Sequence, residues 1–77
     1  MAKGDFWEKE KVVKEIEINA KNKIIVKKVS KSGKDYVDIR KYFIKDGEWL
    51  PGKGIAVPDD LADEIADIIM ESGSIKL

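Results

Sequence analysis

Residues 35–57 read DYVDIRKYFIKDGEWLPGKGIAV, and this stretch decides the fold. Asp46 and Gly47 stand between two apolar and aromatic runs, which is the pattern of a tight hairpin between antiparallel strands. The first run interleaves apolar, aromatic and basic residues instead of alternating cleanly, which indicates that both faces of this strand are used. Pro51 donates no hydrogen bond to a sheet, so the second strand lies at an edge or bends there.

Two further strands are predicted before this hairpin. The strict alternation of EIEI favours a strand over residues 12–19, with a short amphipathic helix over residues 8–19 as the alternative. The β-branched run KIIVKKVSK, which begins at Lys23 after the turn-like NAKN, predicts the next strand. Gly33 supplies the positive φ that a hairpin turn needs, so a third strand is expected over residues 34–44.

The hydrophobic period changes after Pro58. Four apolar residues recur at helical spacing and form a stripe, called the helical stripe below: Leu61, Ile65, Ile68 and Ile69. Acidic residues crowd the first turn, where the helix dipole favours negative charge, and Gly73 predicts the end of the helix. The sequence therefore predicts an α+β fold, a four-stranded antiparallel β-sheet followed by one C-terminal amphipathic α-helix.

The length of 77 residues allows a single domain, here residues 12–77, preceded by a flexible arm over residues 1–11. A domain of this size buries only about 60–65% of the surface that its unfolded chain exposes. The chain has no Cys for a disulfide, and neither Cys nor His for structural zinc. We therefore expect a homodimer.

No apolar run approaches the roughly 18 residues that a membrane span requires, and the N-terminus shows no apolar core of a secretory signal. We expect a soluble, intracellular protein without a membrane partner. The formal net charge is zero, but its distribution is uneven. Through Pro58 there are 14 basic and 9 acidic residues, whereas from Asp59 onward there are one basic and six acidic residues. This asymmetry indicates a basic surface beside an acidic one.

An enzymatic function is not expected. Without His or Cys, general acid–base chemistry depends on a carboxylate pair in a cleft, and the acids here gather on the predicted helix. Two pairs four residues apart, Asp60 with Glu64 and Asp63 with Asp67, are interpreted as a solvated acidic face. Hard cations usually need more oxygen ligands, from a folded loop. We predict no metal and no cofactor.

Basic and aromatic residues gather around the second, third and fourth strands. The candidate nucleic-acid-binding residues are Lys27, Lys28, Lys31, Lys34, Arg40, Tyr42, Phe43, Trp49 and Lys53. A line of cations matches the phosphates of an extended strand, and aromatic rings stack on bases without sequence preference. The alternative is that the lysines only solubilise the sheet. Strict alternation places Phe43 in the core with Val37 and Ile39, unless a bulge near Lys41 exchanges the two faces.

The motifs VDIRKYF (residues 37–43), KDGE and LPGKGIAV (residues 50–57), followed by the helix, resemble the single-stranded-DNA-binding domain of the transcriptional coactivator positive cofactor four. The resemblance extends from about residue 16 to residue 72. It implies a curved four-stranded antiparallel sheet that grips single-stranded or melted DNA without much sequence preference. It also implies dimerisation largely through the helices, which places the helical stripe at the dimer interface. By position it makes Arg40 a backbone contact, Phe43 a base-stacking ring, and Lys34 and Lys53 basic contacts.

The partner implied by this resemblance is single-stranded DNA, with RNA left open because stacking and phosphate contacts do not read the 2′-hydroxyl. Further partners are transcription or replication proteins. The expected location is the cytoplasm, on the nucleoid, in a bacterium and the nucleus in a eukaryote. The alternative function is a protein-interaction module that docks through the C-terminal helix and Trp49.

Overall fold

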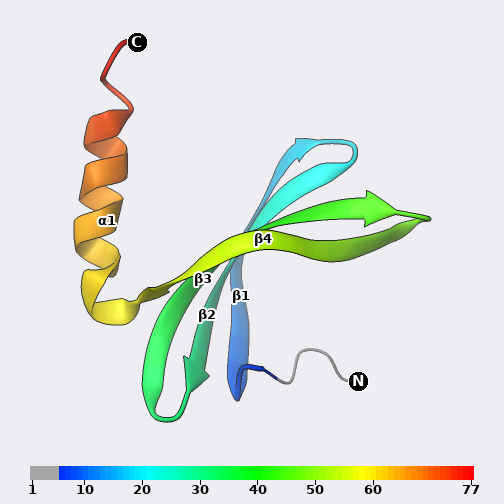
Figure 1. The fold of residues 1–77 in the computed structure, drawn as a ribbon, viewed down its shortest axis with the longest axis horizontal. Helices are drawn as coiled ribbons and strands as arrows, with labels where there is room; N and C mark the ends of the chain where they lie inside the picture. Colours follow the sequence, from blue (N-terminus) through cyan, green and yellow to red (C-terminus); the bar gives the residue numbers. More distant parts are fainter. Residues whose placement is uncertain (1–5) are drawn as a thin grey trace.

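The computed structural model describes residues 6–77, which form one antiparallel sheet and one helix (Figure 1). The elements are β1 (Lys9–Asn19), β2 (Asn22–Lys31), β3 (Lys34–Lys45), β4 (Glu48–Pro58) and α1 (Asp59–Ser72). Each strand pairs with its neighbours in sequence, in the order β1-β2-β3-β4, and the sheet is strongly twisted. The predicted fold class and order of elements are confirmed.

Two hairpin turns depend on positive φ at both central residues. Ser32 and Gly33 have φ of 55° and 77° between β2 and β3, and Asp46 and Gly47 have φ of 54° and 80° between β3 and β4. This combination defines the two-residue turn whose twist matches that of the flanking strands. Both predicted hairpins are therefore present at the predicted residues.

Strand β1 begins three residues earlier than predicted. Lys9 already pairs with Ser30, and the backbone N–H of Glu8 donates to the Ser30 carbonyl at 2.9 Å. The early part of β1 gives no alternating signal because all of its residues are exposed, so neither of its faces has to be apolar. Part of the predicted flexible arm is thus sheet, and its first five residues lie outside the described part of the chain.

Strand β4 carries one extra residue beside Lys41. Arg40 pairs with Gly54 and Tyr42 pairs with Pro51, so two residues of β4 lie opposite Lys41. The pairing of β2 with β3 is unbroken. The bulge therefore belongs to β4, and β3 keeps its strict alternation. Strand β4 is an edge strand, as Pro51 requires.

Alternation along the strands gives the sheet two chemically different faces. The groove face carries from β2 and β3 the residues Lys23, Ile25, Lys27, Val29, Lys31, Lys34, Tyr36, Asp38, Arg40 and Tyr42. The apolar face carries from β2, β3 and β4 the residues Ile24, Val26, Val37, Ile39, Phe43, Leu50, Ile55 and Val57, together with the polar residues Asn22, Lys28, Ser30, Asp35 and Lys41. Basic and aromatic groups are thus concentrated on the groove face.

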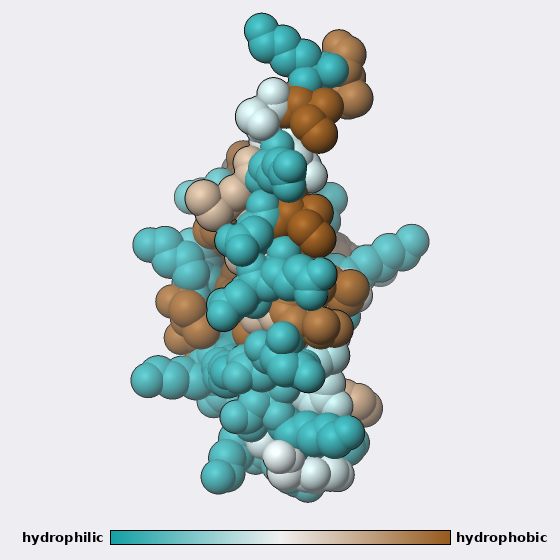
Figure 2. All heavy atoms as spheres, turned by 90° about the vertical axis from the view of Figure 1, so that its left-hand side faces the viewer, coloured by the Kyte–Doolittle hydropathy of each residue, from teal (hydrophilic) through white to brown (hydrophobic). Residues whose placement is uncertain are grey.

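The hydrophobic core of a single chain is small. Within residues 6–77, the buried hydrophobic side chains are Ile25, Val29 and Val57. Helix α1 contacts β3 and β4, contains no buried residue, and stands beside the sheet rather than across it (Figure 1). Viewed from the helix side, hydrophobic side chains lie at the surface beside charged ones (Figure 2). A single chain therefore leaves much of its apolar surface uncovered.

Helix α1 ends at Gly73, as predicted. The Gly73 N–H donates to the Ile69 carbonyl at 3.1 Å, and its φ of −64° is right-handed, so this helix end does not depend on the left-handed conformation. Residues 6–77 contain no helix long and apolar enough to cross a membrane.

Candidate nucleic-acid interface

Two hollows lie on the groove face and share part of their walls. One is lined by residues that include Trp7, Lys27, Arg40, Tyr42, Trp49 and Gly52. The other lies toward the β2–β3 hairpin and is lined by residues that include Phe6, Trp7, Lys31, Lys34, Tyr36 and Arg40. Phe6, Trp7 and Arg40 line both hollows, which therefore adjoin; the two together are called the groove below.

Arg40 lies where the two hollows meet. Its Nε and Nη2 donate to the Asp38 carboxylate at 3.3 and 3.0 Å, and its Nη1 donates to the Gly52 carbonyl at 3.0 Å. Among the described residues, Asp38 is the only buried charged side chain. A guanidinium has five N–H donors, so two remain for a group that enters the groove. The ion pair thus fixes Arg40 in one orientation and leaves it able to bind an anion.

Gly54 allows the edge strand to approach Arg40 closely. A Cβ at this position would lie 2.6 Å from the Ile39 carbonyl oxygen and 2.8 Å from the Arg40 Cα. Real Cβ atoms do not approach backbone atoms so closely, so a larger residue would push β4 away from β3. Gly54 and the β4 bulge therefore set the position of the Gly52 carbonyl that holds Arg40.

Lysines of β2 lie over aromatic rings of the groove face. The Nζ of Lys23 is 4.5 Å from the centre of the Trp49 ring, and the Nζ of Lys27 is 5.7 Å from the centre of the Tyr42 ring. Such cation–π contacts hold a positive charge beside a π-face. A base can stack on the opposite face of such a ring or displace the lysine, and the lysine then stays within reach of the phosphate of that base.

Lys27 is also paired with Glu10, whose Oε1 accepts a hydrogen bond from Nζ at 3.0 Å. Burial lowers the pKa of Lys27, but the hydrogen bond to Glu10 and the Tyr42 side chain outweigh this effect, so the pKa lies above its ordinary value of 10.5. Lys27 therefore keeps its positive charge in the groove at neutral pH.

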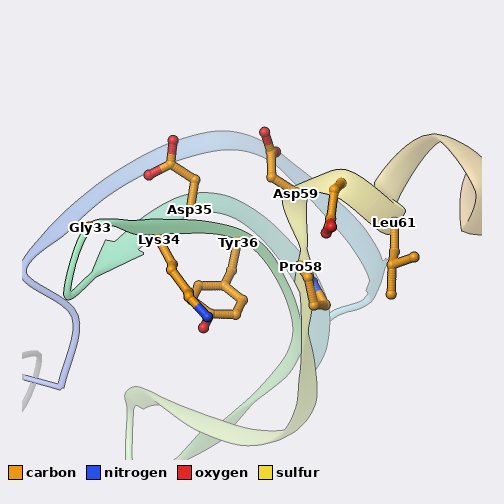
Figure 3. A pocket seen from close by; sticks show the side chains of 8 residues that line it. Gly33, Lys34, Asp35, Tyr36, Pro58, Asp59 and Leu61 are labelled. Atoms are coloured by element: carbon orange, nitrogen blue, oxygen red, sulfur yellow. The ribbon is translucent and has the colours of Figure 1, made fainter.

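A separate pocket between the start of β3 and the start of α1 shows the alternation of β3 directly (Figure 3). Lys34 and Tyr36 point to one side of the strand, whereas Asp35, between them, points to the other side together with Asp59. Asp59 pairs with Lys28, which belongs to the apolar face. The first acidic residue of α1 is thus held away from the groove.

Most of the predicted nucleic-acid-binding residues reach the groove face: Lys27, Lys31, Lys34, Arg40, Tyr42 and Trp49. Lys28 and Phe43 lie on the apolar face, where Phe43 pairs with Leu50. Strict alternation along β3 therefore holds for Phe43, but its side chain is 36% exposed and does not belong to the buried core. The stacking role implied by the resemblance stays a prediction. Lys53 is exposed in the β4 bulge, beside the groove.

Phe6 and Trp7 are groove residues that sequence reasoning assigned to a flexible arm. The Trp7 ring centre is 5.4 Å from that of Tyr36 and 4.7 Å from that of Phe6. The available signal was a pair of adjacent aromatic residues inside an otherwise charged segment. Two adjacent aromatic side chains can be buried in a core or bind a ligand, and the sequence does not show which surface they contact.

The helical stripe, predicted as a dimer interface, is largely uncovered. Leu61, Ile68 and Ile69 are exposed and Ile65 is half-buried. The acidic pairs on this helix are not joined by a third metal-binding side chain. Within residues 6–77 no group of three or more His, Cys, Asp or Glu side chains is placed to hold a metal ion.

The fold and the site together define a class of small proteins in which a four-stranded antiparallel sheet carries a basic and aromatic groove and is followed by one helix. The chain belongs to the family described as Transcriptional Coactivator p15 (PC4), whose family model matches residues 17–68. The resemblance to positive cofactor four is therefore confirmed. This family is a nucleic-acid-binding, non-enzymatic one with DNA-binding and coactivator-like roles.

Solved structures with this fold include two crystal forms of a PC4 homologue from Burkholderia pseudomallei K96243. The orthorhombic form has a TM-score of 0.78 and 19% sequence identity, and the match covers 91% of this chain and 97% of that chain. The tetragonal form has a TM-score of 0.76 and 21% identity, and the match covers 84% and 98%. These matches establish the shared fold. The comparison with curated proteins finds no match.

Proposed function

We propose that this protein binds single-stranded DNA without sequence preference and acts as a coactivator-like protein. The observation that carries this proposal is the meeting of cations and aromatic rings in one groove, with Arg40 at its centre and Lys27 and Trp49 nearby. The cations neutralise phosphates, and the rings stack on bases. Family membership independently supports nucleic acid as the partner.

The groove favours a single strand over a duplex for a physical reason. The bases of a duplex stack on one another, so the rings of Tyr42 and Trp49 can stack only on bases that are already free or have been melted. The pairing of each ring with a lysine couples stacking to a phosphate contact. We therefore expect affinity to depend on both the number of free bases and the salt concentration.

We further propose that the protein acts as a homodimer. Ile55 on the apolar face is 60% exposed, and Ile68 and Ile69 in the helical stripe are 52% and 59% exposed. Uncovered apolar surface of this kind marks an interaction site, and a single chain of this size with so small a core is marginal. A second copy that covers these surfaces would leave both groove faces free for DNA.

The alternative, a protein-interaction module that docks through α1 and Trp49, has weaker support. Trp49 lies at the start of β4, and α1 begins after the end of that strand. The strand between them corresponds to about 30 Å of extended chain. Trp49 also lies in the groove beneath Lys23. The helix and this ring therefore do not form a single docking surface.

The test is a fluorescence-anisotropy titration of labelled oligo-dT of about 20 nucleotides, a length that exceeds the footprint of one small domain. The same titration is made with a duplex of equal length and at several salt concentrations. Tight, salt-dependent binding that prefers the single strand is expected. Absence of binding to oligo-dT at low salt would overturn the proposal.

A further inference from the structure

Phe6 and Trp7 are held on the groove face by defined contacts. The two rings meet edge to face at 4.7 Å, with an interplanar angle of 88°, and Trp7 lies against Tyr36. Glu8 ties the segment to the β2–β3 hairpin, because its Oε1 accepts a hydrogen bond from the Ser32 N–H at 3.0 Å. Its own N–H donates to the Ser30 carbonyl. The aromatic pair is thus anchored next to the β2–β3 hairpin, where the two hollows meet.

This part of the groove repeats the chemistry of the other part. The Nζ of Lys31 is 3.9 Å from the centre of the Phe6 ring, as Lys23 and Lys27 lie over Trp49 and Tyr42. Lys31 also lines the same hollow as Trp7. Each half of the groove therefore offers an aromatic ring with a lysine beside it.

We propose that Phe6 and Trp7 form a base-stacking site for a nucleotide of the bound single strand, next to the β2–β3 hairpin where the two hollows meet. This inference rests on the proposed function and extends it, because the strand then runs from Trp49 past Arg40 to Trp7. Lys31 supplies the cation for the phosphate of that nucleotide. The site adds a contact that depends on bases and not on charge.

The exposure of Phe6 favours a binding site over a cover for the groove, while Trp7 is half-buried against Tyr36. A segment that closed the groove would bury its own rings, whereas Phe6 is 63% exposed. Both rings line the open hollows. The two roles make opposite predictions, since loss of a stacking site weakens DNA binding and loss of a cover strengthens it.

The first test compares the wild type with Phe6→Ala/Trp7→Ala on oligo-dT and on an abasic strand of equal length, which keeps the phosphates. Loss of one stacked base is expected to reduce the affinity for oligo-dT by about fivefold or more and to leave that for the abasic strand almost unchanged. The salt dependence should keep its slope, because no charge is removed. Lys31→Ala, which removes the proposed phosphate contact of the same site, should instead lower that slope by about one.

The second test uses single-tryptophan variants and does not depend on the stability of the double variant. In Trp49→Phe the only remaining tryptophan is Trp7, and its fluorescence should be quenched by saturating oligo-dT but not by the abasic strand. Trp7→Phe, which keeps an aromatic ring, should retain most of the affinity. Unquenched Trp7, or an unchanged or higher oligo-dT affinity of the double variant, overturns this inference while the proposed function stands. Absence of binding by the wild type overturns both.

Discussion

The guanidinium of Arg40 and the carboxylate of Asp38 face each other across one intervening residue of β3, joined by hydrogen bonds of 3.0 and 3.3 Å. The Asp38 side chain is 4% exposed and that of Arg40 is 30% exposed. One arginine therefore neutralises a buried acid and also presents donors to the groove. Loss of Arg40 is expected to affect both the fold and the binding of DNA.

Arg40→Ala is expected to lower the free energy of unfolding by about 3 kcal/mol, because Asp38 is left buried without a partner. Asp38→Asn/Arg40→Ala removes that unpaired charge and should recover part of the loss. Urea denaturation, at a protein concentration held constant, measures both values. If the single and double variants lose the same free energy of unfolding, the unpaired Asp38 charge does not explain the destabilisation by Arg40→Ala.

Lys34→Ala and Lys53→Ala are each expected to weaken binding to all single-stranded sequences and to lower the slope of log affinity against log salt by about one. The matched control is Lys28→Ala, which removes the same charge from the apolar face. Its surface pair with Asp59 contributes at most about 1 kcal/mol, so the fold should persist. An equal change in slope for Lys28→Ala would contradict the assignment of the two faces.

Trp49→Ala is expected to weaken binding to oligo-dT by about 1–3 kcal/mol through loss of a stacked base. Phe43→Ala, at the neighbouring β3 position that faces away from the groove, should leave DNA affinity almost unchanged once the protein is folded. Its effect should fall on the free energy of unfolding. Anisotropy titrations measure the loss of DNA affinity, and urea denaturation measures the loss of stability. If Phe43→Ala weakens DNA binding and Trp49→Ala does not, Phe43 and not Trp49 is the stacking ring.

Ile68→Glu places a charge in the helical stripe and is expected to dissociate the proposed homodimer, because an unpaired charge is costly in an apolar interface. Sedimentation should then show a monomer, and the urea midpoint of the wild type should rise with protein concentration. Asp67→Asn is the control, since it changes an exposed neighbour on the same helix. A wild-type midpoint independent of concentration would argue against the homodimer.

The hairpins and the helix could be predicted because their signals are local. Asp46 and Gly47 are suited to positive φ, and the helical stripe repeats with the period of one α-helix. The position of the β4 bulge could not be predicted, because it depends on how β4 pairs with β3 around Lys41. No residue type in β4 other than Gly and Pro marks such a shift.

The β3 residues of the candidate site could be assigned to a face from the sequence, because the side chains of β3 alternate without interruption. Arg40 and Tyr42 share a face by simple parity, and the same parity places Phe43 on the other side. The resemblance to the family suggested the opposite for Phe43, since it aligns residues by motif and not by face. Trp7 escaped prediction because its contact with Tyr36 joins segments far apart in the sequence.

The position of α1 beside the sheet also has a kinetic consequence. The basic excess lies in the part of the chain that forms the sheet and the acidic excess follows Pro58, so the folded chain is an electric dipole. An approaching polyanion is turned toward the sheet and repelled by the helix before any contact forms. Added salt should therefore slow the encounter itself, and removal of helix acids such as Asp63 or Glu64 should change the association rate more than the dissociation rate.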